Sequence, residues 1–186
     1  INIELAIKTI EPGIFLETGA IEINGNGTLL ATEQCLLKRN PHLSKEDYEK
    51  AFAKFLGINK VIWLKQGLMN DHTDGHIDDL VKFVSANKIL CCYEDDPKDK
   101  NYEILKNNFE VLVKESLEVI KLPMPHMRYD DGAKAPVSYA NFYIGNEVVL
   151  VPTFNDPNDE KALKIIQSYF PNRKVTGIDC RDLIYG

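Results

Sequence analysis

The residues best suited to chemistry are concentrated in one stretch of the chain, Asp71 to Leu80. It holds half of the chain's four histidines and four aspartates, namely His72, His76, Asp71, Asp74, Asp78 and Asp79. Imidazoles among carboxylates suit proton transfer, metal binding or recognition of a cationic substrate. Gly75 lies in the middle, where a tight backbone could bring these side chains together. The stretch is therefore the candidate functional site, with all three chemistries open.

A metal centre is one of these three interpretations. His72 and His76 are spaced as H-x-x-x-H, and zinc hydrolases place two histidines one helical turn apart. Gly75 weakens a helix between them, however, and no glutamate follows His72. We therefore predict a site without a metal, and keep a metal-dependent hydrolase that uses this Asp/His cluster as an alternative.

Composition narrows the choice of partner. The chain has 186 residues, of which 44% are hydrophobic and 27% charged, as in soluble globular proteins. Its net charge is −6 and no cluster of Lys and Arg stands out, which argues against nucleic acid. No apolar run approaches the roughly 20 residues of a membrane span, so no membrane partner is expected. An acidic protein favours a small cationic molecule.

The four cysteines are Cys35, Cys91, Cys92 and Cys180. None forms a C-x-x-C pair, which excludes a zinc ribbon and a thioredoxin motif. Their spacing indicates no disulfide framework, so we expect a reducing, cytoplasmic location. We expect Cys35, Cys91 and Cys92 to be small buried apolar residues. Because the first residue is Ile1 rather than Met, the natural N-terminus is expected to be absent.

The elements that must position the cluster follow a repeated order of strand, strand, helix and strand. The first set is Ile14–Leu16, Ala20–Ile23, a turn at Asn24–Gly27, Thr28–Thr32, a helix from Ser44 to Leu56 and Lys60–Leu64. The second is Leu80–Val84, Lys88–Tyr93, a helix at Asn101–Lys114 and Glu118–Leu122. The third is Val137–Ile144, Glu147–Val151, a helix at Asp156–Tyr169 and Val175–Ile178. This order predicts an α/β protein of three ββαβ units, roughly 1–65, 80–122 and 137–180, and disfavours a Rossmann sheet.

Several motifs occur together and in order along nearly the whole chain. They are Phe15–Ile21, Gly25–Thr28, Glu33–Leu36, Asn40–Ser44, Thr73–Leu80, Ser138–Tyr143, Val151–Phe154 and Gly177–Asp179. In these motifs the chain resembles the agmatine deiminase and bacterial (Porphyromonas-type) peptidylarginine deiminase family of the guanidine-modifying pentein superfamily. The resemblance implies a propeller of five ββαβ units around a central site. Residues 1–186 would then be about three units of one catalytic domain, with no separate domains.

The resemblance also implies an activity. Agmatine would be hydrolysed to N-carbamoylputrescine and ammonia through a covalent cysteine intermediate, without a cofactor, in putrescine biosynthesis. A peptidylarginine deiminase is the alternative within the family, and an inactive guanidinium-binding module is an alternative of another class. The partner would be a small guanidinium cation, and self-association into a homo-oligomer stays open.

Matched residue by residue, the resemblance assigns roles within the cluster. His76 would be the general acid and base, and Asp78 a carboxylate that holds the substrate. Glu17 would orient the histidine or bind the guanidinium. Asp74 and Asn141 would contribute to substrate binding. A carboxylate pairs well with the planar donors of a guanidinium, and histidine titrates near neutral pH.

Several features depart from the family pattern or add to it. Thr18 replaces the first glycine of the family's L-E-G-G motif. The nucleophilic cysteine is expected in a glycine-rich segment after Gly186, and an upstream substrate-binding aspartate is missing, so the chain as written is expected to be inactive. Cys180 matches no catalytic position. The polar loop containing His126, Asp130 and Asp131 is a candidate substrate lid.

Overall fold

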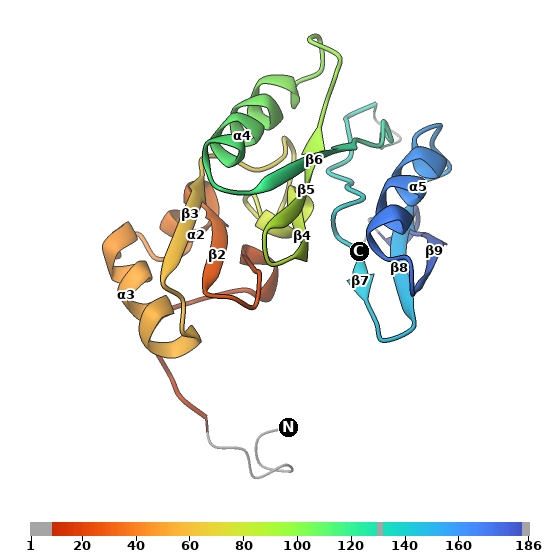
Figure 1. The fold of residues 1–186 in the computed structure, drawn as a ribbon. Helices are drawn as coiled ribbons and strands as arrows, with labels where there is room; N and C mark the ends of the chain where they lie inside the picture. The colour runs from red at the N-terminus through yellow and green to blue at the C-terminus, as the bar shows by residue number, and fades with distance from the viewer. Residues whose placement is uncertain (1–8, 130–131, 184–186) are drawn as a thin grey trace.

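The computed structural model describes residues 9–129 and 132–183. Within these ranges the chain forms three sheets of three strands that follow one another along the chain (Figure 1). In each sheet the first two strands pair antiparallel, and the third pairs parallel with the second. A helix precedes each third strand and provides the crossover that a parallel pair requires. The predicted order of three ββαβ units is therefore confirmed.

The first unit comprises β1 (Ile21–Ile23), β2 (Thr28–Thr32), α2 (Glu33–Arg39), α3 (Lys45–Leu56) and β3 (Lys60–Leu64). The second comprises β4 (Val81–Ser85), β5 (Lys88–Tyr93), α4 (Tyr102–Lys114) and β6 (Glu118–Pro123). The third comprises β7 (Tyr143–Ile144), β8 (Val148–Thr153), α5 (Asp159–Tyr169) and β9 (Lys174–Asp179). Two short 3-10 helices, η1 (Thr18–Ala20) and η2 (Ile77–Asp79), precede the first and second units.

Local sequence signals account for the ends of these elements. The Ser44 hydroxyl accepts a hydrogen bond from the Asp47 N–H and the Asp47 carboxylate bonds back to the Ser44 N–H, so a capping box starts α3. Gly57 ends α3 in the left-handed region, with φ of 69°. In the β1–β2 turn, Asn24 Oδ1 accepts hydrogen bonds from the N–H groups of Asn26 and Thr28. These contacts account for the predicted helix from Ser44 to Leu56 and the predicted turn at Asn24–Gly27.

Three predicted strand and helix assignments are corrected. Ile14–Leu16 is not a strand, because the Asn40 side chain exchanges two hydrogen bonds with the backbone of Phe15 and takes the place of a neighbouring strand. Most of Val137–Ile144 is irregular, and only its last two residues form β7; the Ser138 hydroxyl instead accepts the Ala140 N–H. The helix expected from Asp156 begins at Asp159.

Helix α2 was not predicted from the sequence. Thr32 caps it by accepting the Cys35 N–H at 3.1 Å. Glu33 lies in its first turn and Lys38 and Arg39 in its last, which suits the helix dipole. The cap and the charges were a readable signal, but seven residues directly after a strand resemble a continuation of that strand.

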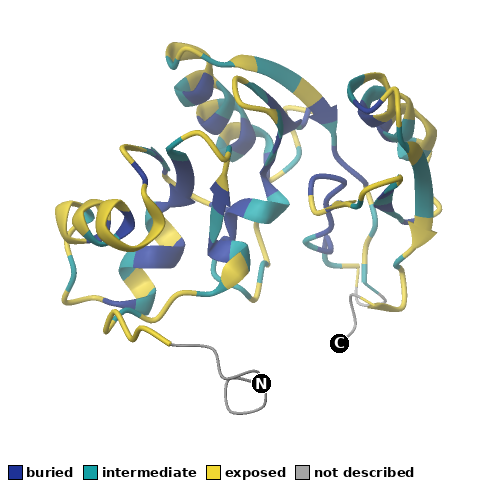
Figure 2. Cartoon of the chain, turned by 60° about the horizontal axis from the view of Figure 1, so that its bottom comes forward, coloured by how far each residue is buried: buried dark blue, intermediate teal, exposed yellow. Residues whose placement is uncertain are grey.

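The apolar side chains of the described core form two clusters. One comprises residues of β2, α2 and α3, and the larger one joins residues of all three units, including β2, β3, β4, β5, α4, β8 and α5. Figure 2 colours each residue of the ribbon by its burial. Ile77 and Leu80, which flank Asp78 and Asp79, are fully buried and belong to the larger cluster. The core therefore anchors the end of the Asp/His stretch. Among the residues described, no helix is long and apolar enough to cross a membrane.

A buried carboxylate joins the first unit to the second. Glu22, which is 8% exposed, accepts the Phe83 N–H at 2.9 Å and the Lys82 ammonium at 3.3 Å. Burial raises the pKa of Glu22 despite the Lys82 charge. Close by, the Asn24 side chain donates to the Ala86 carbonyl at 2.8 Å. These hydrogen bonds and the ion pair join the β1–β2 hairpin to the β4–β5 hairpin.

Glu22→Ala should lower the free energy of unfolding by about 1–3 kcal/mol, because the Phe83 N–H would lose its buried acceptor. Glu22→Gln should cost less, since the amide oxygen can still accept that N–H. Urea unfolding measures both, with the exposed Glu103→Ala as the control expected within about 0.5 kcal/mol of the parent. Equal stability of the alanine variant and the control would contradict the role of Glu22 at this junction.

Candidate active site

The loop between β3 and η2 is organised by the Asp71 carboxylate. It accepts the N–H groups of Thr73 at 2.8 Å, Gly75 at 2.9 Å and His76 at 3.2 Å. An aspartate that bonds the backbone ahead of it is a common device for holding a turn. Asp71 therefore supports the backbone at His76 rather than facing a ligand.

The same loop is also held by a close approach of the Gly67 and Gly75 backbones. A Cβ on Gly67 would lie 2.1 Å from the Gly75 Cα, so there is no room for a side chain at Gly67. Gly75 itself has φ of 89°, a conformation that L-residues rarely adopt. The Thr32 hydroxyl donates to the Gly75 carbonyl at 2.6 Å. The cap of α2 and the loop that carries His76 are thus tied together.

His76 lies between two carboxylates. Its Nε2 is 3.1 Å from Glu17 Oε2, and its Nδ1 is 3.9 Å from Asp78 Oδ1. The residue is 9% exposed, so little water competes for the ring. A carboxylate on one ring nitrogen fixes the orientation of an imidazole and stabilises its protonated form. The structure therefore brings together Glu17, His76 and Asp78, the three residues predicted to be catalytic.

Arg39, which was not singled out from the sequence, holds Glu17 in place. Its Nε donates to Glu17 Oε2 at 2.7 Å and its Nη2 to Glu17 Oε1 at 3.3 Å. Nη2 also reaches the Thr73 carbonyl at 3.1 Å, and Nη1 bonds Asp74. The Arg39 guanidinium, and next the His76 ring, lower the pKa of Glu17. Glu17 therefore stays ionised beside His76.

Asp74 occupies the far side of this ion pair. Its carboxylate bonds both Lys38 and Arg39, which lower its pKa. Asp74 has φ of 64°, so it also forms the turn before Gly75. In this arrangement the Asp74 carboxylate faces two cations of α2.

Gly19 is a second residue that the sequence did not single out. A Cβ at this position would lie 2.5 Å from Asp78 Oδ2 and 2.6 Å from His76 Nδ1. These distances are shorter than real Cβ contacts. The side chains of His76 and Asp78 therefore pack directly against the Gly19 backbone, where no side chain would fit. The neighbouring Thr18 starts η1 without disturbing this contact. The replaced glycine of the motif is thus the dispensable one here.

Asp78 and Asp79 differ from Glu17 in their electrostatics. Burial raises the pKa of Asp78, and burial together with Asp78 and Asp71 raises the pKa of Asp79 to about 8. Asn141 Nδ2 lies 3.5 Å from Asp79 Oδ1, at the limit of a hydrogen bond. Asp79 and Asn141 line a cavity of about 270 Å³, and Cys180 is another of its lining residues. Because the pKa of both aspartates is raised, a bound cation would stabilise their ionised forms.

Cys35 lies unexpectedly close to the site. Its Sγ, Glu17 and His76 place one donor atom each within 4.8 Å of one another, a spacing that could hold a metal ion. Glu17 is already engaged by Arg39, whose positive charge opposes a second cation. The thiol is fully buried, and burial raises its pKa to about 11. As a neutral buried thiol, Cys35 is unsuited to act as a nucleophile.

The other sequence candidates lie elsewhere. His72 is exposed, outside the Glu17–His76–Asp78 group. Cys91 and Cys92 are buried in β5, as expected. The His126 side chain is half-exposed, and the backbone N–H of His126 donates to the Asp156 carboxylate at 2.7 Å. Asp130 and Asp131, the other members of the predicted lid, lie outside the described residues.

Solved structures share this arrangement of elements. The agmatine deiminase of Enterococcus faecalis is 33% identical, with a TM-score of 0.85 over 92% of this chain and 54% of its own. A C. jejuni agmatine deiminase variant with substrate bound is 35% identical, with a TM-score of 0.88 over 92% of this chain and 53% of its own. These likenesses confirm the predicted fold class, a pentein α/β fold of ββαβ units.

Sequence comparison agrees with the structural one. A curated protein of Latilactobacillus sakei, named "Putative agmatine deiminase", is 36% identical over 93% of this chain and 54% of its own length. The chain thus spans about half the length of the curated relatives it matches. The profile of the Porphyromonas-type peptidyl-arginine deiminase family matches residues 2–186. The chain therefore belongs to the Porphyromonas-type peptidyl-arginine deiminase family.

Proposed function

We propose that this chain carries the acid/base and substrate-binding part of an agmatine deiminase, within one catalytic domain. The observation that carries the proposal is the buried imidazole of His76 between the carboxylates of Glu17 and Asp78. Carboxylates accept the paired N–H groups of a guanidinium, and a histidine can protonate a leaving amine. The net charge of −6 suits a cationic substrate.

In the proposed reaction, a cysteine thiolate attacks the guanidinium carbon of agmatine. The C–N bond to one terminal nitrogen breaks, and His76 gives that nitrogen a proton so that it leaves as ammonia. His76 then takes a proton from water, whose oxygen attacks the same carbon. The C–S bond breaks, the thiolate is restored, and N-carbamoylputrescine is released. The buried, neutral thiol of Cys35 is not proposed as this nucleophile.

The supporting residues are assigned from their contacts. Asp78 would hold the guanidinium, whose charge would draw the Asp78 carboxyl into its ionised form. Glu17 would keep the ring of His76 oriented. Asp74 was expected to bind substrate, and its bonds to Lys38 and Arg39 support a positioning role through Arg39. Asn141 lines the cavity beside Asp79 and is proposed to contact the substrate.

Agmatine is preferred over a peptidyl arginine because the candidate acids are partly enclosed. A peptide would need a cleft open at both ends. Four free thiols among the described residues suit a reducing cytoplasm, where putrescine synthesis would use the product. Assays of the complete protein with agmatine and with a peptide containing an internal arginine decide between the two substrates.

His76→Ala in the complete protein should lower kcat for ammonia release from agmatine by roughly 10²–10⁴-fold, because the proton donor is lost. The exposed His72→Ala is the matched control and should retain the parental rate. A chelator added to the parent should leave the rate unchanged; loss of activity would favour the metal-dependent alternative. Parental turnover by His76→Ala would refute its proposed role.

Gly19→Ala should lower kcat/KM for agmatine by at least about tenfold, because the new methyl group would displace His76 and Asp78. Gly25→Ala is the matched control. Its Cβ would meet open space in the β1–β2 turn, although its φ of 69° costs some stability. Steady-state kinetics and circular dichroism of both variants separate a displaced site from lost folding. Unchanged kcat/KM in folded Gly19→Ala would contradict the close approach.

Asp79 should make the protein less stable as pH rises from about 4 to about 8. The unfolded carboxyl ionises near 3.8 while the folded one, with a pKa of about 8, still holds its proton, so raising pH favours unfolding across this interval. Asp79→Asn should flatten the decline, whereas the exposed Asp95→Asn should preserve it. Urea unfolding over this range tests the prediction, and parallel curves for parent and Asp79→Asn would refute it.

A further inference from the structure

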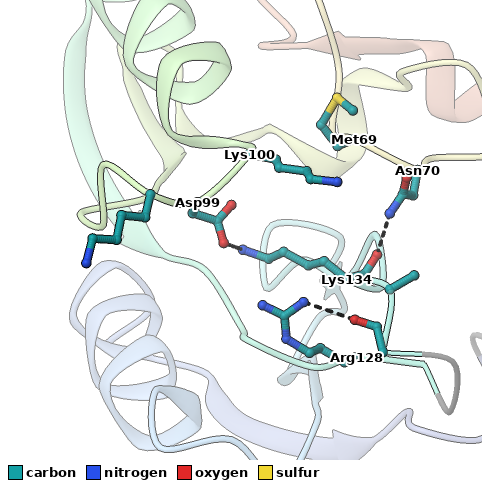
Figure 3. Close-up of a pocket in the computed structure, with 9 residues that line it drawn as sticks. Met69, Asn70, Asp99, Lys100, Arg128 and Lys134 are labelled. Atoms are coloured by element: carbon teal, nitrogen blue, oxygen red, sulfur yellow. Dashed lines mark hydrogen bonds and ion pairs between the residues drawn. The ribbon is translucent and has the colours of Figure 1, made fainter.

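A cavity of about 290 Å³ lies where three loops meet, outside the Glu17–His76–Asp78 group (Figure 3). One wall comes from the loop after β3, one from the loop between β5 and α4, and one from the loop between β6 and β7. We call it the basic pocket. Its lining residues are Met69, Asn70, Lys98, Asp99, Lys100, Arg128, Gly132, Ala133 and Lys134.

The charge of the basic pocket is opposite to that of the chain. Its described lining carries four cations, Lys98, Lys100, Arg128 and Lys134, against one carboxylate, Asp99. The whole chain has a net charge of −6. Like charges gathered around one hollow repel each other, and a bound anion relieves that repulsion. The lining therefore points to a negatively charged occupant.

Lys134 gives this pocket a fixed floor. Its side chain is only 9% exposed, and its ammonium bonds Asp99 at 2.5 Å and Glu94 at 3.2 Å. Asp99, which lines the pocket, and Glu94, which lies behind it, both pair with Lys134 and neutralise its charge. The unbalanced positive charge of the pocket therefore comes from the more exposed Lys98, Lys100 and Arg128.

Lys100 and Arg128 lie on opposite sides of Lys134 (Figure 3). The Arg128 guanidinium uses Nη1 to donate to the Gly132 carbonyl at 3.1 Å, which fixes the side chain and leaves further N–H groups available. The Lys100 ammonium offers three donors. The two groups belong to different loops but line the same cavity, so a ligand that fills this cavity would contact both.

We propose that the basic pocket binds a small phosphate-class oxyanion. Such an anion accepts several hydrogen bonds at once and pairs with the planar donors of arginine. Lys100 and Arg128 would supply the main contacts, above the ammonium of Lys134. The volume of about 290 Å³ accommodates a phosphate group with some of its hydration shell.

The position of the basic pocket links it to the loop that carries His76. Asn70 Nδ2 donates to the Lys134 carbonyl at 3.0 Å, and the Met69 N–H donates to Asn101 Oδ1 at 2.8 Å. The next residue, Asp71, holds the backbone at His76. An anion in the pocket would therefore brace the start of the candidate active-site loop.

Isothermal titration of the complete protein with inorganic phosphate tests the proposal at constant ionic strength. Lys100→Ala with Arg128→Ala should weaken binding by at least about tenfold, since each change removes a charged hydrogen-bond donor. Lys50→Ala with Lys164→Ala removes the same charge from exposed positions on α3 and α5 and should bind like the parent. Thermal unfolding without phosphate confirms that each variant is folded, and Arg128→Gln alone replaces the double variant if it is not.

Two results would overturn the proposal. One is phosphate binding that is equally strong in the pocket variant and in the charge-matched control, which would mean that the anion responds only to net charge. The other is no saturable binding of phosphate by the parent at millimolar concentration. Slower amide exchange of Gly75 and His76 on adding phosphate to the parent, and not to the pocket variant, would support the brace.

Discussion

The arrangement of the candidate site depends on the guanidinium of Arg39. This one group, at the last turn of α2, bonds the Glu17 carboxylate, the Thr73 carbonyl and the Asp74 carboxylate. It therefore joins the segment before β1 to the loop after β3. The low pKa of Glu17 and its fixed position next to His76 both follow from this contact. Without Arg39, Glu17 would have no charged partner opposite His76 among the described contacts.

Three acids of the candidate site, Glu17, Asp78 and Asp79, differ in their tendency to ionise. Arg39 keeps Glu17 ionised, whereas burial keeps Asp78 and Asp79 inclined to hold their protons. Glu17 thus offers a negative charge to the imidazole beside it. Asp78 would become ionised when a bound cation compensates its negative charge. Carboxylates in one candidate site are therefore prepared for different tasks by their surroundings.

Much of this was predictable because it is local. Caps, glycine turns and alternating elements indicated the unit boundaries, the motif around His76 pointed to Asp78, and the motif at Phe15–Ile21 pointed to Glu17. Arg39 and Gly19 were missed because their importance arises from contacts between distant positions, namely the 22 positions between Glu17 and Arg39 and the 57 and 59 that separate Gly19 from His76 and Asp78. The strand assigned to Ile14–Leu16 was wrong for the same reason, since its partner is the side chain of Asn40.

The separation of Glu17 from His76 has a consequence for folding. The two residues are 59 positions apart and lie on either side of the first unit, so their contact closes a loop that contains the whole of that unit. Pairing within the β1–β2 and β4–β5 hairpins involves far shorter loops and pays less entropy. We therefore expect the Glu17–His76 contact to form later in folding than either hairpin.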